Sequence, residues 1–424
     1  MQLRKKYKPV RNTLAVATAS LLGSVAHSPS VQAAGDWEVD TSLMYYSETD
    51  RVSLYEPVIR ARKDLGNDSF LNMRLVVDTL TGSSANGAIP TSSAQTFTTP
   101  SGNSTYTTGA NTVPLDSSFH DTRVAVSGEW ERPMSANWRA IYGLNLSNEF
   151  DYQSIGVSAT LNRDFNQKNS TLTLGVAYNA DTVKPVGGAP VGLTSMPVFP
   201  AVKATQGDSL SKDVYDILIG WTQVLGRKDL MQFNFNYGNE SGYLSDPYKI
   251  LSVVDGTTGD LIATDQYLFE NRPDDRTRQA LFWRWSHQFE TDVLRVSYRY
   301  FWDDWGITSH TVDTHYRWEL GGGHYVEPHL RYYTQTAADF YHTSLVDGSI
   351  PAYASADYRL ADLTTTTFGL KYGVELSKDS EFSFRAEKIT QQADPSVVIG
   401  NQASQDLLPD VEAIVLQFNY SLLF

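Results

Sequence analysis

The sequence predicts an all-β protein, a transmembrane antiparallel β-barrel of about sixteen strands preceded by a cleaved signal peptide. Three observations support this prediction. Apolar and polar side chains alternate with a period of two along many segments, short and long connections alternate between those segments, and no segment keeps a helical period. No segment after the N-terminus supplies the about 18 continuous apolar residues that a membrane-spanning helix needs.

The C-terminal segment 414–424 shows the alternation most clearly. Its apolar residues are Leu416, Phe418, Tyr420, Leu422 and Phe424, and the residues between them are polar. Alternate side chains of a strand point to opposite faces, so one face would meet lipid and the other water. This alternation, ending on an aromatic residue, resembles the recognition signal of bacterial outer-membrane barrels. We therefore expect the barrel-assembly machinery to bind this strand through Phe424.

The same pattern recurs along the chain and defines sixteen predicted strands. Most are roughly 10 to 13 residues long, enough to cross the apolar layer at a tilt of about 40°. The second strand is the weakest, because Pro57 interrupts it. The predicted strands are 37–46, 52–62, 69–79, 121–131, 137–149, 152–163, 170–181, 212–224, 229–238, 277–289, 292–302, 309–320, 323–334, 358–376, 381–390 and 411–424; counts of fourteen or eighteen stay open.

The connections between these strands support the count independently. All even-to-odd connections are short turns, whereas five odd-to-even connections are long loops, at 80–120, 182–211, 239–276, 335–357 and 391–410. Outer-membrane barrels have short turns in the periplasm and long loops outside, so we expect both termini to be periplasmic. The loop stretch 82–118 is rich in Ser, Thr, Gly and Asn, and is expected either to be partly disordered or to fold inward as a constriction.

Closure is the physical requirement behind this fold. In hydrocarbon every backbone polar group must be paired, so a membrane sheet must close on itself. Interfacial tryptophans are expected near the ends of the strands. Six tryptophans fit that position, although a few of them can face the lumen instead: Trp37, Trp130, Trp138, Trp221, Trp302 and Trp318.

The N-terminus predicts export. Five basic residues precede the apolar run 14–26, and Val31-Gln32-Ala33 offers a cleavage pattern, so we expect a signal peptide at 1–33 and a mature chain, 34–424, in the outer membrane of a Gram-negative cell. The alternative is a retained N-terminal anchor. Loss of the five basic residues takes the net charge from −14 to −19, which argues against nucleic acid as a partner. With no cysteine, the chain has no thiolate metal site and no site for covalent haem attachment.

Several short stretches, spread over nearly the whole mature chain, resemble a bacterial outer-membrane family known as domain of unknown function 3570. Among them are DPYK at 246–249 and ENRPD at 270–274. The resemblance implies an outer-membrane barrel and brings no established activity and no catalytic residues. The remaining stretches are 77–88, 95–98, 114–116, 121–123, 149–152, 164–166, 303–307 and 337–341.

Charged residues at the inward positions of four neighbouring strands are the main candidate site. The predicted basic wall consists of Arg284, Arg295, Arg299, Arg317, Arg331, His315 and His329. Asp313, Glu319 and Glu327 face the same way. Such a wall suits a channel with a transverse field. The alternative is a structural network of ion pairs that stiffens the barrel, and the two can coexist.

Other clusters are expected to be structural. The stretch 303–310 holds Asp303, Asp304 and His310, and a solvated turn is favoured there over a calcium site. The acids of 246–249 and 270–275 are expected to order a long loop by local hydrogen bonds. Neighbouring Ser309, His310 and Asp304 do not by themselves guarantee a catalytic triad. Gly321–Gly323 is expected to be a hairpin turn. No catalytic residue, metal or cofactor is expected, and the protein is not expected to be an enzyme.

Three functions remain open for such a barrel in outer-membrane lipid. The favoured one is a porin-like channel for small polar solutes or ions, because about sixteen strands leave an aqueous lumen unless loops plug it. The second is a sheath or scaffold whose lumen holds a periplasmic or lipoprotein partner, for example one related to electron transfer. The third is an adhesin or outer-membrane enzyme.

Overall fold

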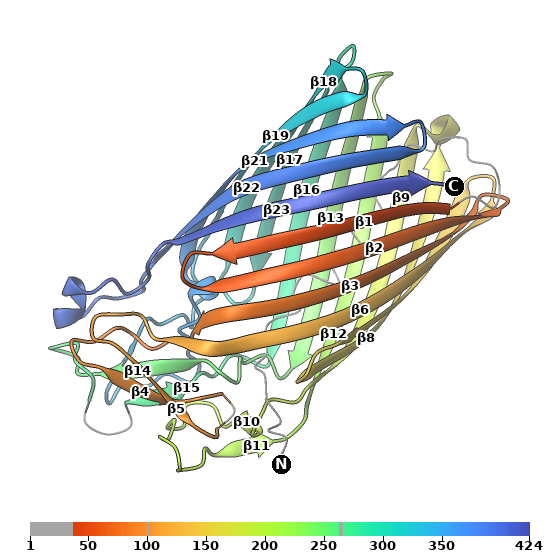
Figure 1. The fold of residues 1–424 in the computed structure, drawn as a ribbon. Helices are drawn as coiled ribbons and strands as arrows, with labels where there is room; N and C mark the ends of the chain where they lie inside the picture. The colour runs from red at the N-terminus through yellow and green to blue at the C-terminus, as the bar shows by residue number, and fades with distance from the viewer. Residues whose placement is uncertain (1–36, 101, 263–265) are drawn as a thin grey trace, which may run out of the picture.

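The computed structural model describes residues 37–100, 102–262 and 266–424, so the predicted signal peptide lies outside the described residues. Within them, sixteen strands form one closed antiparallel barrel (Figure 1). In their order around the barrel, the strands are β1 (Trp37–Glu48), β2 (Val52–Gly66), β3 (Ser69–Ala85), β6 (Leu115–Ser135), β7 (Trp138–Asn148), β8 (Tyr152–Phe165), β9 (Ser170–Val183), β12 (Leu210–Val224), β13 (Asp229–Gly242), β16 (Asp275–Gln288), β17 (Val293–Asp303), β18 (Thr308–Gly321), β19 (His324–Gln335), β21 (Asp362–Ser377), β22 (Ser380–Asp394) and β23 (Val411–Leu423).

The first and last strands seal the barrel. β1 pairs with β23 along nearly its whole length, with Leu43 opposite Phe418. Each of the sixteen predicted strands corresponds to one of these strands, so the predicted count is confirmed. Among the described residues, no helix has the length and apolar character needed to cross a membrane.

The strand that contains Pro57 shows how the sheet accommodates a residue without an N–H. Pro57 lies inside β2 and opposite Leu43 of β1. On the other side of β2, the pairs with β3 stop at Tyr55 and resume at Val58 without a change of register. The missing donor therefore interrupts one ladder locally and does not end the strand.

Several strands extend further than predicted at one end of the barrel. β3 continues to Ala85 and β6 begins at Leu115, so the connection between them is 86–114 instead of 80–120. The next long connections are 184–209 and 243–274. The connection predicted at 335–357 is also displaced, because residues 358–361 belong to the loop and β21 begins at Asp362. These strand ends are more polar than the membrane-facing segments, and so the alternation did not reveal them.

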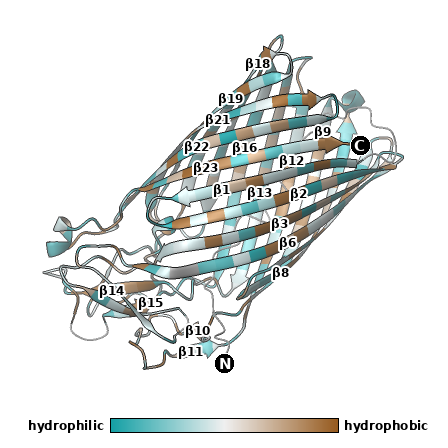
Figure 2. Ribbon diagram, viewed as in Figure 1, coloured by the Kyte–Doolittle hydropathy of each residue, from teal (hydrophilic) through white to brown (hydrophobic). Residues whose placement is uncertain are grey.

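The outer face of the barrel is apolar. Large exposed hydrophobic residues occupy alternate positions, such as Leu144 and Leu146 on β7, and Figure 2 shows the alternation along the strands. All six predicted interfacial tryptophans lie on this outer face by strand parity, including Trp302, which lies near the loop end of β17. The other five lie near the turn end of the barrel: Trp37, Trp130, Trp138, Trp221 and Trp318.

At the opposite end of the barrel, the long loops pack together into one structure, which we call the cap: residues 86–114, 184–209, 243–274, 336–361 and 395–410 (Figure 1). It contains small sheets, in which β14 (Ile250–Val254) pairs with β15 (Tyr267–Phe269) and β20 (Leu345–Val346), β4 (Gln95–Thr98) pairs with β5 (Thr105–Thr108), and β10 (Ala189–Pro190) pairs with β11 (Thr205–Gly207).

The first long loop is an ordered part of the cap. Its β4–β5 hairpin buries Phe97 completely, with the ring centroid 5.0 Å from that of Tyr267. Ile250 and Phe269 complete this apolar cluster. Of the two alternatives for 82–118, partial disorder is therefore wrong for the described residues, because a few apolar side chains anchor an otherwise polar loop. The inward constriction stays a prediction.

Candidate functional site

The predicted basic wall occupies one face of four neighbouring strands. Cross-strand partners point to the same side of a sheet, and two rows cross these strands. One row joins Arg284 through Ser297 and Asp313 to Arg331. The next row joins Arg295 through His315 to His329. The intervening residues, such as Val312 and Leu330, are the exposed apolar residues of the outer face.

Two of the five predicted arginines form ion pairs. Arg295 lies 2.5 Å from Glu327, and Arg317 lies 2.5 Å from Glu319. In these two cases the predicted acids neutralise arginines of the wall, as expected if the wall is a structural network of ion pairs.

The other three arginines have no ion pair with a described carboxylate. Arg284 and Arg299 lie over aromatic rings instead, with guanidinium carbons 5.2 Å from the centroid of Phe282 and 5.3 Å from that of Phe301. The side chain of Arg331 is exposed. The wall is therefore only partly compensated, and its uncompensated charges lie on β16, β17 and β19.

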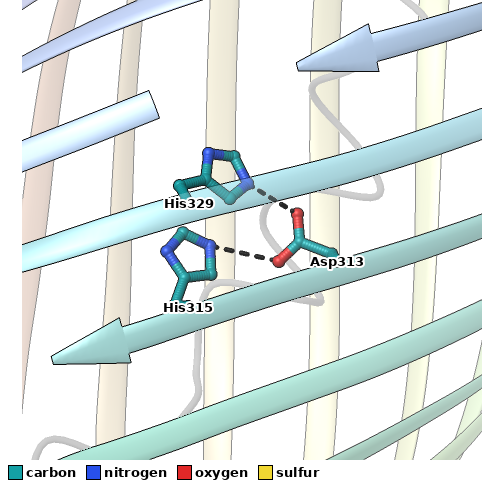
Figure 3. A group of neighbouring side chains, drawn as sticks. All are labelled: Asp313, His315 and His329. Atoms are coloured by element: carbon teal, nitrogen blue, oxygen red, sulfur yellow. Dashed lines mark hydrogen bonds and ion pairs between the residues drawn. The ribbon is translucent and has the colours of Figure 1, made fainter. Parts of the chain in front are cut away.

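The two wall histidines form a compact cluster with Asp313 (Figure 3). Asp313 Oδ1 lies 3.1 Å from His315 Nε2, and Asp313 Oδ2 lies 3.0 Å from His329 Nε2. The imidazole rings stack with their centroids 4.0 Å apart and their planes 7° apart.

A carboxylate also faces the second nitrogen of each ring. His315 Nδ1 lies 3.2 Å from Glu327, and His329 Nδ1 lies 2.8 Å from Glu387 on β22. Glu387 was not among the predicted site residues, although the alternation along the predicted strand 381–390 places it on the inner face.

A second ion-pair network, which was not predicted from the sequence, lies on the inner face nearer the cap. Arg278 bridges Asp216 at 3.1 Å and Glu240 at 2.9 Å. Lys212 reaches Glu240 at 3.0 Å. These residues come from β12, β13 and β16, so their association depends on a register that the sequence does not show.

The cap contains a buried charge cluster built from two loops. Arg272 lies 2.6 Å from Glu270 and 3.0 Å from Asp357, and Arg359 lies 2.5 Å from Asp357. Burial opposes the ionised form of Asp357, but Arg359, Lys249 and Arg272 together outweigh it and hold the pKa of Asp357 well below its usual range. The predicted loop-ordering role of 270–275 is thus confirmed for Glu270, as is that of Asp246, which accepts a bond from the Tyr248 amide.

The short turn between β7 and β8 carries a buried carboxyl group, that of Asp151. Asp151 is fully buried beneath the cap and accepts a hydrogen bond of 2.8 Å from the hydroxyl of Tyr248. Burial raises the pKa of Asp151 to about 7, although the bond from Tyr248 acts in the opposite direction. Burial also raises the pKa of the neighbouring Glu149 to about 8.

Three of the cap loops also enclose a cavity of about 280 Å³. Lys203, Lys249, Tyr106 and Phe269 are among its lining residues. Burial lowers the pKa of Lys203 to about 8. The Lys203 ammonium lies 3.3 Å from the carbonyl of Val186, so it is anchored within the cap.

The remaining predicted clusters are structural. Asp303 accepts bonds from the backbone amides of Trp305 and Ile307, which confirms a turn ordered by a carboxylate that binds N–H groups. The prediction that the turn is solvated is wrong for Trp305 and Ile307, which are buried in an apolar cluster. Ser309 and His310 are consecutive residues of β18 and point to opposite faces, so they form no triad. Gly321–Gly323 spans the hairpin between β18 and β19 with three positive φ angles, 84°, 63° and 78°.

Most of the stretches that carry the family resemblance lie in or near the cap, whereas 164–166 lies at the turn end of β8. Trp305, Ile307, Phe340 and Tyr341 form one of its apolar clusters with Leu360. The other stretches supply Asp151, Tyr248 and the Glu270–Arg272 pair described above. The resemblance therefore follows the structure of the cap more than that of the wall.

Comparisons with known proteins find barrels of low sequence similarity. The siderophore receptor PirA from Acinetobacter baumannii is 8% identical with a TM-score of 0.44, and the match covers 91% of this chain and 58% of that one. The monoaromatic hydrocarbon channel CymD is 8% identical with a TM-score of 0.41, covering 93% and 89%. OccK2 from Pseudomonas aeruginosa is 8% identical with a TM-score of 0.40, covering 92% and 98%. Such low identities and TM-scores give no information about the function of this chain.

No curated protein matches the chain. The sequence model of a family described as a protein of unknown function, DUF3570, matches residues 11–422, which is nearly the whole chain. The match agrees with the resemblance of the short stretches. The chain therefore belongs to the DUF3570 family, which is described as a family of proteins of unknown function.

Proposed function

We propose that this barrel is a porin-like channel for small polar solutes or ions, and that its inner wall favours anions. One observation carries the proposal: Arg284, Arg299 and Arg331 lie on the inner face without an ion pair to any described carboxylate, whereas Arg295 and Arg317 next to them are paired.

Uncompensated arginines imply water in the lumen. A charge enclosed in a dry interior without a partner costs several kcal/mol, so such residues are stable only where water or a mobile counter-ion reaches them. Arg331 is exposed, which agrees with a hydrated lumen. Rings and walls of arginine attract passing anions in this setting.

The cap is a second feature that supports the proposal of a channel for small solutes. Its loops share apolar clusters and a buried charge cluster, so they form a folded cover over one mouth of the barrel. A packed cover limits the size of what enters. The orientation follows the general rule for these barrels, with the turns in the periplasm and the cap outside the cell.

Planar-bilayer recording of the purified mature chain tests the proposal. We expect discrete conductance steps and, in a KCl gradient, a reversal potential that favours chloride. Replacement of Arg284, Arg299 and Arg331 by Gln should reduce that preference. The matched control is Arg132→Gln with Arg163→Gln, since these arginines lie on the outer face beside Trp130 and Trp138.

Two results would overturn the proposal. One is the absence of conductance from correctly folded protein, which would favour a scaffold if a stoichiometric partner were found in its lumen. The other is an unchanged ion preference in the triple variant.

A further inference from the structure

Asp313, His315 and His329 bring three metal-ligand atoms together on the inner wall. Their ligand atoms lie within 4.8 Å of one another, and no other group of three or more such residues meets that condition in the described part of the chain. The two histidines are direct cross-strand partners on β18 and β19, so the backbone register fixes their spacing. The long strands β17 and β21, which pair with β18 and β19, hold this register.

The distances between these atoms suit a shared ion. The carboxylate oxygens of Asp313 lie 3.1 Å and 3.0 Å from the two Nε2 atoms. Ligands that bind one ion at about 2.0–2.2 Å have such mutual separations. The rings are nearly parallel in the structure, so their lone pairs run side by side. Binding of one ion by both Nε2 atoms would therefore require the two rings to tilt toward each other.

The carboxylates at the Nδ1 atoms of the two histidines resemble those that orient metal-binding histidines in other proteins. A histidine that binds a metal through one nitrogen usually donates its other N–H to a carboxylate, which fixes the tautomer and the ring orientation. Here Glu327 faces Nδ1 of His315, and Glu387 faces Nδ1 of His329. Both Nε2 atoms are thereby turned toward Asp313.

The charges of the cluster also fit a divalent ion. A carboxylate oxygen lies beside each of the four ring nitrogens, two from Asp313 and one each from Glu327 and Glu387. The negative charge of these groups attracts a divalent cation. Arg295 and Arg385 neutralise the outer carboxylates Glu327 and Glu387.

We propose that Asp313, His315 and His329 form a binding site for a borderline divalent transition metal, with Zn²⁺ as the simplest case. Two imidazole nitrogens and one carboxylate oxygen are a donor set that suits Zn²⁺, Ni²⁺ or Fe²⁺. Calcium and magnesium require more oxygen ligands than the cluster offers. The remaining coordination positions are open to water. This proposal does not depend on conduction through the barrel.

Isothermal titration of the full, untagged mature chain with Zn²⁺, in detergent, tests the site. We expect one Zn²⁺ per chain. His315→Gln or His329→Gln should weaken binding at least about 100-fold, and Glu387→Gln about 10- to 100-fold. Co²⁺ used in place of Zn²⁺ should give visible absorption bands that are lost in the same variants.

The chain offers a matched control on the same two strands. His310 of β18 and His324 of β19 lie on the outer face, where each contacts a tyrosine hydroxyl. The double variant His310→Gln with His324→Gln should bind Zn²⁺ as the parent does. The proposal fails if the folded parent takes up neither Zn²⁺ nor Co²⁺, or if Zn²⁺ binding survives in His315→Gln and His329→Gln. Circular dichroism checks that each variant is folded. The first outcome, no uptake of Zn²⁺ or Co²⁺, is measured on the parent protein and so does not depend on the folding of any variant.

Discussion

The wall of the barrel and the cap contain similar charged residues and arrange them differently. In the cap, Arg272 and Arg359 are both paired with Asp357 and lie among buried groups. In the wall, Arg331 has no ion pair in the described structure and is exposed. The comparison shows that charge in the cap holds loops together, whereas part of the charge in the wall is left to interact with water and solutes.

The largest expected effect comes from the charge cluster of the cap. Asp357→Asn leaves Arg272 and Arg359 without their shared carboxylate, and loss of one partner of a buried ion pair costs about 3–5 kcal/mol. We expect the cap loops to become sensitive to protease while the barrel stays folded. The control is Asp347→Asn, an exposed residue of the same loop, which should leave cleavage unchanged. Equal resistance of both variants would show that the cluster does not hold the cap.

A charge on the outer face should be the next most disruptive change. Leu330 lies beside Arg331 on β19 but points outward. Leu330→Arg should lower the free energy of unfolding in lipid by about 2–4 kcal/mol, as arginine does near the bilayer midplane. Arg331→Leu is the matched exchange on the inner face and should change stability by less than about 1 kcal/mol. Similar losses in urea titrations of the two variants would contradict the assignment of faces.

The buried carboxyl groups of Asp151 and Glu149 should make the stability of the cap depend on pH. Because the folded pKa of Asp151, about 7, exceeds its ordinary value of 3.8, its stabilising contribution is complete below about pH 4 and is lost as the pH rises through 7. Glu149 acts in the same direction up to about pH 8. We expect Asp151 alone to cost the cap about 2–3 kcal/mol between pH 5 and 8, and Glu149 to add to this loss.

Urea titration of protease resistance at several pH values measures this effect. Asp151→Asn together with Glu149→Gln should flatten the profile. A cap that becomes more stable as the pH rises would contradict the account, as would an unchanged slope in the double variant.

The smallest expected effect concerns the paired part of the wall. Glu327→Gln removes the carboxylate that neutralises Arg295 and so adds a fourth uncompensated arginine to the wall. A unit charge at about 4 Å in water contributes about 1 kcal/mol, so chloride permeability relative to potassium should rise by no more than about fivefold. Glu319→Gln, which frees Arg317, is the parallel variant. A shift toward cations in both variants would contradict the proposed role of the wall.

The same contrast explains which features were predictable from the sequence. The wall follows a period of two, so the sixteen strands and the inward positions of Arg284, Arg299 and Arg331 follow from local alternation. Pairing depends on register between strands, and therefore the Arg278 network and the contact between His329 and Glu387 were missed. The cap depends on contacts between distant loops, such as Arg272 with Asp357, and no local pattern indicates them. The buried Phe97 is one apolar residue in a polar loop, and composition alone suggested disorder there.

The most direct test of the central claim is a cysteine scan along β7, because the chain contains no cysteine of its own. Single cysteines at Leu144, Asn145 and Leu146 would be exposed to a membrane-impermeant thiol reagent after reconstitution into vesicles. We predict labelling at the inward, partly exposed Asn145 but not at the lipid-facing Leu144 and Leu146 on either side of it. Uniform labelling, or labelling of the leucine positions alone, would show that the inner wall is not the wet face of a membrane barrel.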